Sequence, residues 1–178
     1  MSYKAYNKPK RSKENDLSYG LKCEPQTKIL IEKTFNTKLT HSHFKYSLFD
    51  FYDDTQSYIY EVKNYKYPYE QYRTEIIGTN KGISQHDIFI FRHEDDDTKA
   101  YFIQYDKKLF DTFNTRWIKV DYRPNAVLCY DIPKIHLTHI EEGKEYTFEK
   151  VKGEKNIIKK ILEKDMNEYN RFMELLGN

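Results

Sequence analysis

Asp50, Glu61 and Lys63 bring two acidic groups and an ammonium group into one short part of the chain. Two neighbouring carboxylates repel each other, and a divalent cation such as Mg²⁺ or Mn²⁺ relieves the repulsion because carboxylate oxygens are its preferred ligands. A lysine beside such an ion can position a water molecule or stabilise charge on a phosphoryl oxygen. These residue types therefore indicate metal-dependent cleavage of a phosphodiester bond.

A β-hairpin would bring these side chains together. The polar residues 53–57 (DDTQS) predict a turn, and the alternating rings and aliphatic residues that follow predict a strand. Side chains alternate between the faces of a strand, so Glu61 shares a face with the lysine two residues further on. If Tyr52 pairs with Ile59, Asp50 lies opposite Glu61, with Cβ atoms about 5 Å apart. A register shifted by one residue would send Asp50 to the other face.

The pattern D-x10-E-x-K, formed by Asp50, Glu61, Val62 and Lys63, resembles the catalytic signature of the PD-(D/E)XK nuclease superfamily, which has the restriction-endonuclease-like fold. The resemblance covers residues 20–105. It implies an endonuclease that hydrolyses DNA. Asp50, Glu61 and the main-chain carbonyl of Val62 would hold Mg²⁺ or Mn²⁺, and Lys63 would orient the attacking water.

Members of this superfamily often carry a further acidic residue on an upstream helix. The sequence Gly20-x-x-x-Glu24 is similar to the resolvase-like form of that pattern, which makes Glu24 the fourth catalytic residue and a further metal ligand. Pro25 follows directly and is unusual inside a helix, so either Glu24 lies at a helix start or it is not a ligand. The superfamily also places a helix after the E-x-K strand, and we expect one over residues 68–78.

Polar and aromatic residues near the predicted site would bind nucleic acid in such an enzyme. Charged and amide side chains would contact phosphate groups, and exposed tyrosine rings, including Tyr65, Tyr67 and Tyr69, would stack on unpaired bases. The alternative is an ordinary solvent-exposed face with a few core rings. The predicted contact residues are Asn64, Lys66, Gln71, Tyr72, Arg73 and Lys81.

The remaining elements predict an α/β or α+β fold, with a central mixed sheet flanked by helices and a restriction-endonuclease-like core followed by a C-terminal extension. Besides residues 68–78, we expect helices over 18–36, 106–113 and about 157–178. We expect strands over 41–52, 58–63, 87–93, 99–105, 116–122, 125–132 and 145–150.

The chain has the length of one domain. Residues 1–16 are polar and basic and predict a flexible tail. Residues 17–178 would form a single nuclease-like domain, with its core over about 18–105 and the extension over 106–178.

The amino-acid composition limits which partners and which cellular compartment we expect. The formal net charge of +2 makes no global case for nucleic-acid binding, so a basic surface would depend on local placement. Cys23 and Cys129 lie far apart and form no disulfide framework, and no apolar run approaches the ~20 residues that cross a bilayer. We expect an intracellular protein, cytoplasmic or nuclear. The abundance of Lys, Asn, Ile, Tyr and Phe is typical of A+T-rich genomes, so a virus-encoded protein acting in the host cell or virion is one alternative.

Two other functions fit the same residues. The chain could be a non-catalytic module of this fold that binds DNA or forms a structural part of an assembly such as a viral particle. It could also be an unrelated α+β interaction protein in which the acidic pair arises by chance on an exposed hairpin. Resolvases of this superfamily act as dimers, so a homodimer is a further expectation, with the C-terminal helix as its candidate surface.

Overall fold

The computed structural model describes residues 13–42, 47, 49–55, 57–81, 84–93, 100–119, 125–141, 143–148 and 157–176. Most of the predicted basic tail, residues 1–12, lies outside these ranges. Its last residues, 13–16, belong to the first helix.

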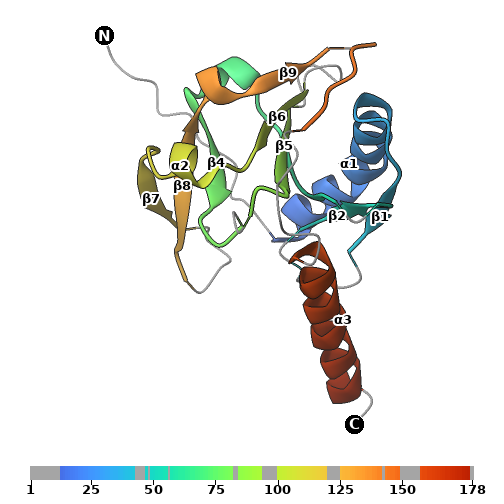
Figure 1. The fold of residues 1–178 in the computed structure, drawn as a ribbon. Coiled ribbons are helices and arrows are strands. Elements are labelled where there is room, and N and C mark those ends of the chain that lie inside the picture. The colour runs from blue at the N-terminus through green and yellow to red at the C-terminus, as the bar shows by residue number, and fades with distance from the viewer. Residues whose placement is uncertain are drawn as a thin grey trace.

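A six-stranded mixed sheet forms the centre of the molecule (Figure 1). Only β3 and β5 run parallel, and each other neighbouring pair is antiparallel. All seven residues of β5 are buried, as expected of a strand covered on both faces. The strands, in spatial order, are β1 (Leu39–His41), β2 (Phe51–Asp53), β3 (Ile59–Tyr65), β5 (Asp87–His93), β6 (Ala100–Gln104) and β9 (Thr138–Ile140).

A smaller antiparallel sheet covers one face of the central sheet. Its strands, in spatial order, are β4 (Thr74–Gly78), β8 (Val127–Pro133) and β7 (Thr115–Ile118). Phe89 and Phe91 of the central sheet pack against Ile77 and Ile132 of the smaller one, and the cluster also includes Phe110 of the short helix α2 (Lys107–Phe110). The segment predicted as an extension therefore supplies strands to both sheets.

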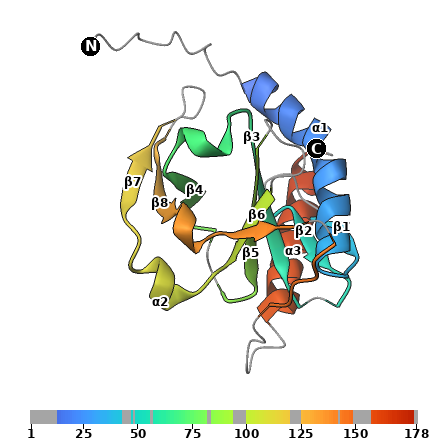
Figure 2. The same ribbon diagram turned by 90° about the horizontal axis from the view of Figure 1, so that it is seen from above.

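Helix α1 (Lys13–Thr34) covers the opposite face of the central sheet (Figure 2). Ile31 is fully buried there against a cluster that includes Tyr60 and Val62 of β3. Pro25 lies inside this helix with an exposed side chain, so the expectation that the helix starts beside Glu24 is wrong. The prediction of flanking helices holds for this face only, because the other face carries the smaller sheet.

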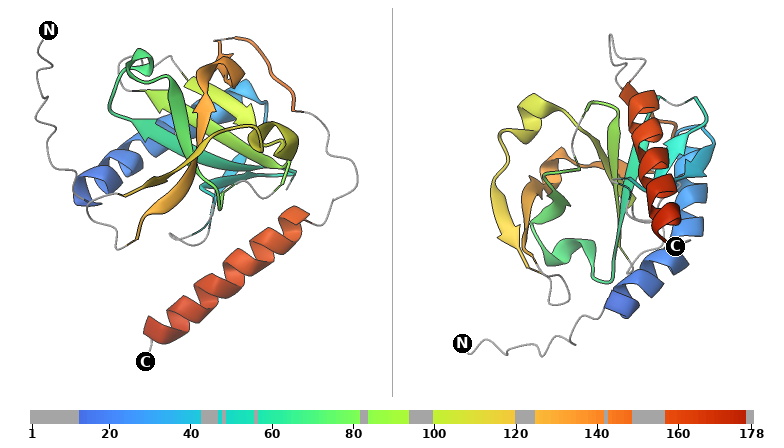
Figure 3. Two further views of the ribbon diagram at one scale, coloured as in Figure 1. Left: turned by 90° about the vertical axis from the view of Figure 1, so that its left-hand side faces the viewer. Right: turned by 90° about the horizontal axis from the view of Figure 1, so that it is seen from below.

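Helix α3 (Ile157–Leu176) confirms the predicted C-terminal helix and extends away from both sheets (Figure 3). Its first turns contact the body of the protein, where Ile158 is buried with Phe49 and Ile59, and Ile161 packs beside them. The Ser47 hydroxyl donates a hydrogen bond to Asp165. No described helix combines the length and the apolar composition that crossing a bilayer requires.

The helix predicted over residues 68–78 is wrong. The segment forms a single 3₁₀ turn, η1 (Tyr69–Gln71), followed by strand β4. Glu75 and Ile77 are buried while their neighbours are half-buried, which is the period-two pattern of a strand. Pairing with β8 satisfies the backbone of these residues, and that partner lies far away in sequence.

The other predicted elements have mixed outcomes. The strand expected over residues 41–52 is limited to β2 and the end of β1, and part of its range lies outside the described residues. Residues 145–148 of the strand predicted over 145–150 are irregular, although Tyr146 and Phe148 pack on the core, and residues 149–150 lie outside the described residues. Strand β9 was not predicted. The structure confirms the α+β class with a central mixed sheet.

Candidate active site

The β2–β3 hairpin has the register on which the predicted site depends. Tyr52 pairs with Ile59, and the Asp50 N–H donates to the Tyr60 carbonyl at 2.8 Å. The predicted pairing of Tyr52 with Ile59 is confirmed, and the paired residues end at Phe51 and Tyr60, so Asp50 lies just before β2 and beside β3.

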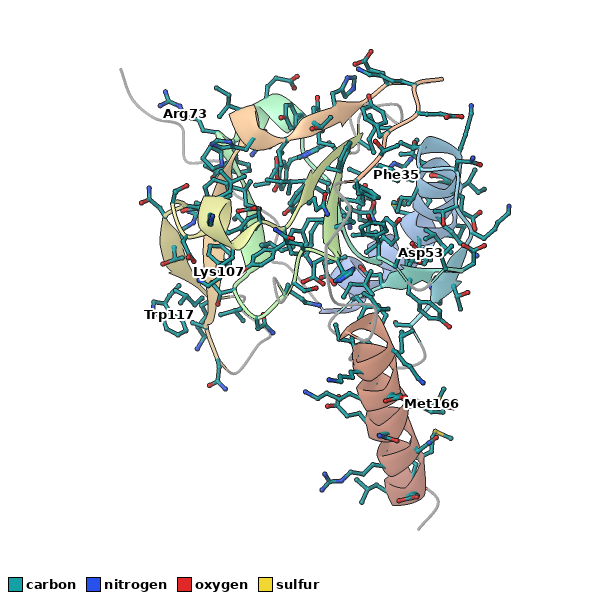
Figure 4. The ribbon with its side chains drawn as sticks, in the orientation of Figure 1. Phe35, Asp53, Arg73, Lys107, Trp117 and Met166 are labelled. Carbon is teal, nitrogen blue, oxygen red and sulfur yellow. The ribbon has the colours of Figure 1, made fainter. Side chains whose placement is uncertain are left out.

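The hairpin turn is held by a side chain. The Asp53 carboxylate accepts hydrogen bonds from the Ser57 N–H at 2.7 Å and from the Thr55 hydroxyl at 3.1 Å. Short polar side chains that bond to the backbone a few residues on are typical of tight turns. Asp53 itself is buried beside β1 and α1 (Figure 4). This local bonding supports the register that pairs Tyr52 with Ile59.

The Asp50 carboxylate closes the end of the hairpin. Its Oδ2 atom accepts a hydrogen bond of 2.6 Å from the Val62 N–H. A side-chain oxygen thus occupies the place that a backbone carbonyl would take in a continued ladder. The contact fixes the carboxylate against β3, next to Glu61.

Glu61 is a buried carboxylate with two cationic partners. Its side chain is 5% exposed, and it pairs through Oε1 with Lys63. Its Oε2 atom lies 2.9 Å from the Nζ atom of Lys81. A buried carboxylate is costly unless it is paired and hydrogen-bonded, and these ammonium groups meet that requirement.

Desolvation of the carboxyl group, followed by repulsion from Glu61, raises the pKa of Asp50 to about 7. The nearby ammonium group of Lys63 and the hydrogen bond from Val62 act in the opposite direction but are weaker. Glu61 therefore lies close enough to Asp50 to disfavour the charged form of the Asp50 carboxyl group. A cation bound between them would relieve this repulsion.

The donor set fits a hard divalent cation. Mg²⁺ commonly takes one or two carboxylates and keeps several waters, and Asp50 and Glu61 supply two. Lys63 is one-third exposed, so its ammonium group lies at the boundary between the protein and solvent. The arrangement can hold a cation near an ammonium group that solvent and a phosphate could reach.

Glu24 does not join this pair. Across the described residues, no three His, Cys, Asp or Glu side chains gather closely enough to hold a metal ion. Helix α1 packs on the other face of β3, where the Thr27 hydroxyl lies 3.2 Å from Asn64 Oδ1. Strand alternation puts Asn64 on the face opposite Glu61 and Lys63. The packing of α1 therefore separates Glu24 from the acidic pair.

The predicted nucleic-acid contacts are dispersed. Lys81 reaches Glu61, whereas Asn64 contacts α1 and Lys66 lies over the Tyr19 ring at 4.6 Å. The Gln71 amide donates to the Tyr72 hydroxyl at 3.1 Å. Arg73 is exposed and points outward (Figure 4). These residues do not form one surface around the carboxylates.

Three of the four tyrosine rings proposed to stack on bases stack on other tyrosine rings. Tyr65 and Tyr67 are stacked with centroids 4.7 Å apart, and Tyr69 is stacked on Tyr101 at 3.8 Å. Tyr72 is the most exposed ring of the set, at 39%. These contacts favour the alternative in which the rings serve mainly as core.

Two features of the structure were not predicted from the sequence. One is the contact of Lys81 with Glu61, for which no local pattern exists. The other is a buried cluster of Glu75, His93 and Lys134 between the sheets. The alternation of buried residues in β4 could have indicated Glu75 as a core residue, had the segment been read as a strand.

Comparison with known proteins found no matching family model, no similar curated protein and no similar solved structure.

Proposed function

We propose that this protein is a metal-dependent endonuclease that hydrolyses DNA phosphodiester bonds at Asp50, Glu61 and Lys63. The observation that carries the proposal is that the hairpin holds the Asp50 carboxylate on the Val62 N–H, close enough to Glu61 to be repelled by it, while Lys63 pairs with Glu61. Two interacting carboxylates with an adjacent ammonium group suit a cation and a phosphate better than they suit a purely structural hairpin.

Each residue would have a distinct role. Asp50 and Glu61 would hold Mg²⁺ or Mn²⁺, together with the Val62 carbonyl. The ion, when bound, would activate water and neutralise charge on the phosphoryl group. Lys63 would orient the attacking water and stabilise negative charge developing on the phosphate. The hydrogen bond from Val62 would keep Asp50 in position for this work.

The observations that support the proposed function all come from the β2–β3 hairpin. Two features that the family resemblance implies are missing from the described residues, namely a helix after β3 and a third acid from Glu24. The proposal therefore requires that two carboxylates and solvent suffice to bind the ion, as is common for Mg²⁺.

The test is cleavage of plasmid, single-stranded and branched DNA by the purified protein. We expect cleavage with Mg²⁺ or Mn²⁺ and none with EDTA. Glu61→Gln and Lys63→Met should each lower the rate by about 100-fold or more, since each removes a charge that acts at the reacting phosphate. Lys107→Met, an exposed lysine on α2, should leave the rate unchanged. Equal cleavage by wild type, Glu61→Gln and Lys63→Met would exclude this site as its source.

A second candidate is a non-catalytic DNA-binding or assembly module. It is favoured by the contacts of Glu61, whose two oxygens are neutralised by lysines without any metal. DNA binding that is indifferent to EDTA, with no cleavage and no Mn²⁺ uptake, would support it. DNA as the partner, a homodimer and an intracellular site of action remain predictions. Sedimentation equilibrium would test the homodimer.

A further inference from the structure

Lys81 reaches the candidate site from the smaller sheet. It lies in the connection between β4 and β5, and its Nζ atom is 2.9 Å from Glu61 Oε2. Lys63 occupies Oε1 of the same carboxylate. Each carboxylate oxygen of Glu61 therefore has an ammonium group beside it.

A turn anchored on the smaller sheet positions Lys81. The Lys81 N–H donates to the Gly78 carbonyl at 2.9 Å, and the Thr79 N–H donates to the Leu128 carbonyl at 2.9 Å. A Cβ atom at Gly78 would lie 2.7 Å from the Asn80 side-chain oxygen, so a glycine suits the start of this turn. The turn thus delivers a cationic side chain from one sheet to a carboxylate on the other.

The two lysines differ in how they are tied to Glu61. Lys63 lies two residues further along β3 and shares its face, so strand geometry keeps it close. Lys81 belongs to a turn and reaches Glu61 through a long, flexible side chain that is 20% exposed. If a cation takes one oxygen of Glu61, the ammonium group with the greater freedom to leave is that of Lys81.

We propose that a bound divalent cation displaces Lys81 from Glu61, and that the released ammonium group then binds a phosphate of the nucleic acid. The inference rests on the proposed function, because it assumes that Asp50 and Glu61 hold the ion. It makes Lys81 the residue that couples metal binding to phosphate binding. Because coupling between two ligands is reciprocal, DNA also raises the affinity for the metal.

The coupling predicts opposite effects of one substitution. Lys81→Met removes the cation that competes for Glu61, so Mn²⁺ binds about five-fold more tightly or better, in the usual range of such couplings. The same substitution removes the phosphate contact, so DNA binds about five-fold more weakly in Mn²⁺. Without metal, wild type and Lys81→Met bind DNA equally, because Glu61 holds the lysine.

The experiment measures Mn²⁺ affinity by titration calorimetry and DNA affinity by fluorescence anisotropy, with a cleavage-resistant phosphorothioate duplex in Mn²⁺ or EDTA. Lys81→Gln repeats the charge removal with a different side chain, Lys81→Arg retains the charge and keeps the coupling, and Lys107→Met changes nothing. Circular dichroism verifies that each variant is folded.

Two results would overturn the inference: unchanged or weaker Mn²⁺ binding in both neutral variants, or an equal loss of DNA affinity with and without Mn²⁺. A wild-type protein that takes up no Mn²⁺ would instead remove the proposed function. Wild-type uptake that Glu61→Gln abolishes but the neutral Lys81 variants leave unchanged would remove only the role of Lys81.

Discussion

At the scale of single residues, Asp50 shows how placing two carboxyl groups close together is costly for folding. Its carboxyl group is desolvated and faces Glu61, and both effects disfavour its charged form. The pKa of Asp50 is therefore raised from 3.8 to about 7. In this pH range the folded protein keeps a proton that the unfolded chain releases, so the contribution of Asp50 to stability falls as pH rises and levels off above pH 7.

Asp50→Asn should remove this pH dependence. We expect the variant to unfold like the wild type near pH 4 and to be more stable at pH 8, by at most about 4 kcal/mol. The amide oxygen can still accept the hydrogen bond from the Val62 N–H, which keeps the comparison conservative. Urea unfolding of both proteins from pH 4 to pH 8 measures the difference. A difference that does not grow over this interval would contradict the assignment.

At the scale of secondary-structure elements, a buried charged cluster links the two sheets. Glu75 of β4 lies with its Oε1 atom 3.2 Å from His93 Nε2 of β5 and 3.3 Å from the Lys134 Nζ atom. His93 Nδ1 is 3.0 Å from the Tyr67 carbonyl, an acceptor only, so Nδ1 carries a proton. The side chains of Glu75 and His93 are fully buried. The stability of this buried cluster therefore depends on the presence of all three side chains.

Glu75→Ala should destabilise the protein by about 3–5 kcal/mol, because it leaves the Lys134 ammonium group without its buried partner. Glu174→Ala, on the exposed side of α3, should change the unfolding free energy by less than about 0.5 kcal/mol. Denaturant unfolding gives both values. Replacing Glu75, His93 and Lys134 together by apolar residues of similar volume should restore most of the stability. A small loss in Glu75→Ala alone would mean that the cluster does not hold the sheets together.

At the scale of the whole molecule, α3 is attached through its first half, and much of its far half is exposed (Figure 3). Ile158 is 1% exposed, whereas Leu175 near the other end is 71% exposed. The first turns of α3 contact Phe49 and Ile59, which are close to Asp50 and Glu61 in the sequence. The base of α3 therefore supports the hairpin that carries the candidate site. The far half of the helix makes little contribution to this support.

Ile158→Ala should therefore cost about 2–5 kcal/mol of unfolding free energy, since it leaves a cavity in a buried cluster. Leu175→Ala shortens a side chain of similar size that is exposed to solvent. It should lower the unfolding free energy by less than about 0.5 kcal/mol when measured in dilute protein. Thermal unfolding followed by circular dichroism compares the two. A large loss in Leu175→Ala that appears only at high protein concentration would indicate that this half of α3 contacts a second copy of the chain.

The sequence by itself determined the hairpin and its acidic pair. The alternation around Glu61 and Lys63 and the turn chemistry of Asp53 are local properties, because strand alternation and Asp side-chain bonding act over a few residues. The C-terminal helix was predictable for the same reason, since its apolar residues repeat at helical spacing within the segment.

Only the tertiary structure decided which other residues reach the site. The segment 74–78 suits a helix or a strand, and pairing with the distant β8 selected the strand. That choice moved Glu75 into the core and carried Lys81 to Glu61, while the packing of α1 on the opposite face kept Glu24 away. Contacts between segments far apart in sequence depend on how whole sheets and helices pack, and no local pattern records that packing.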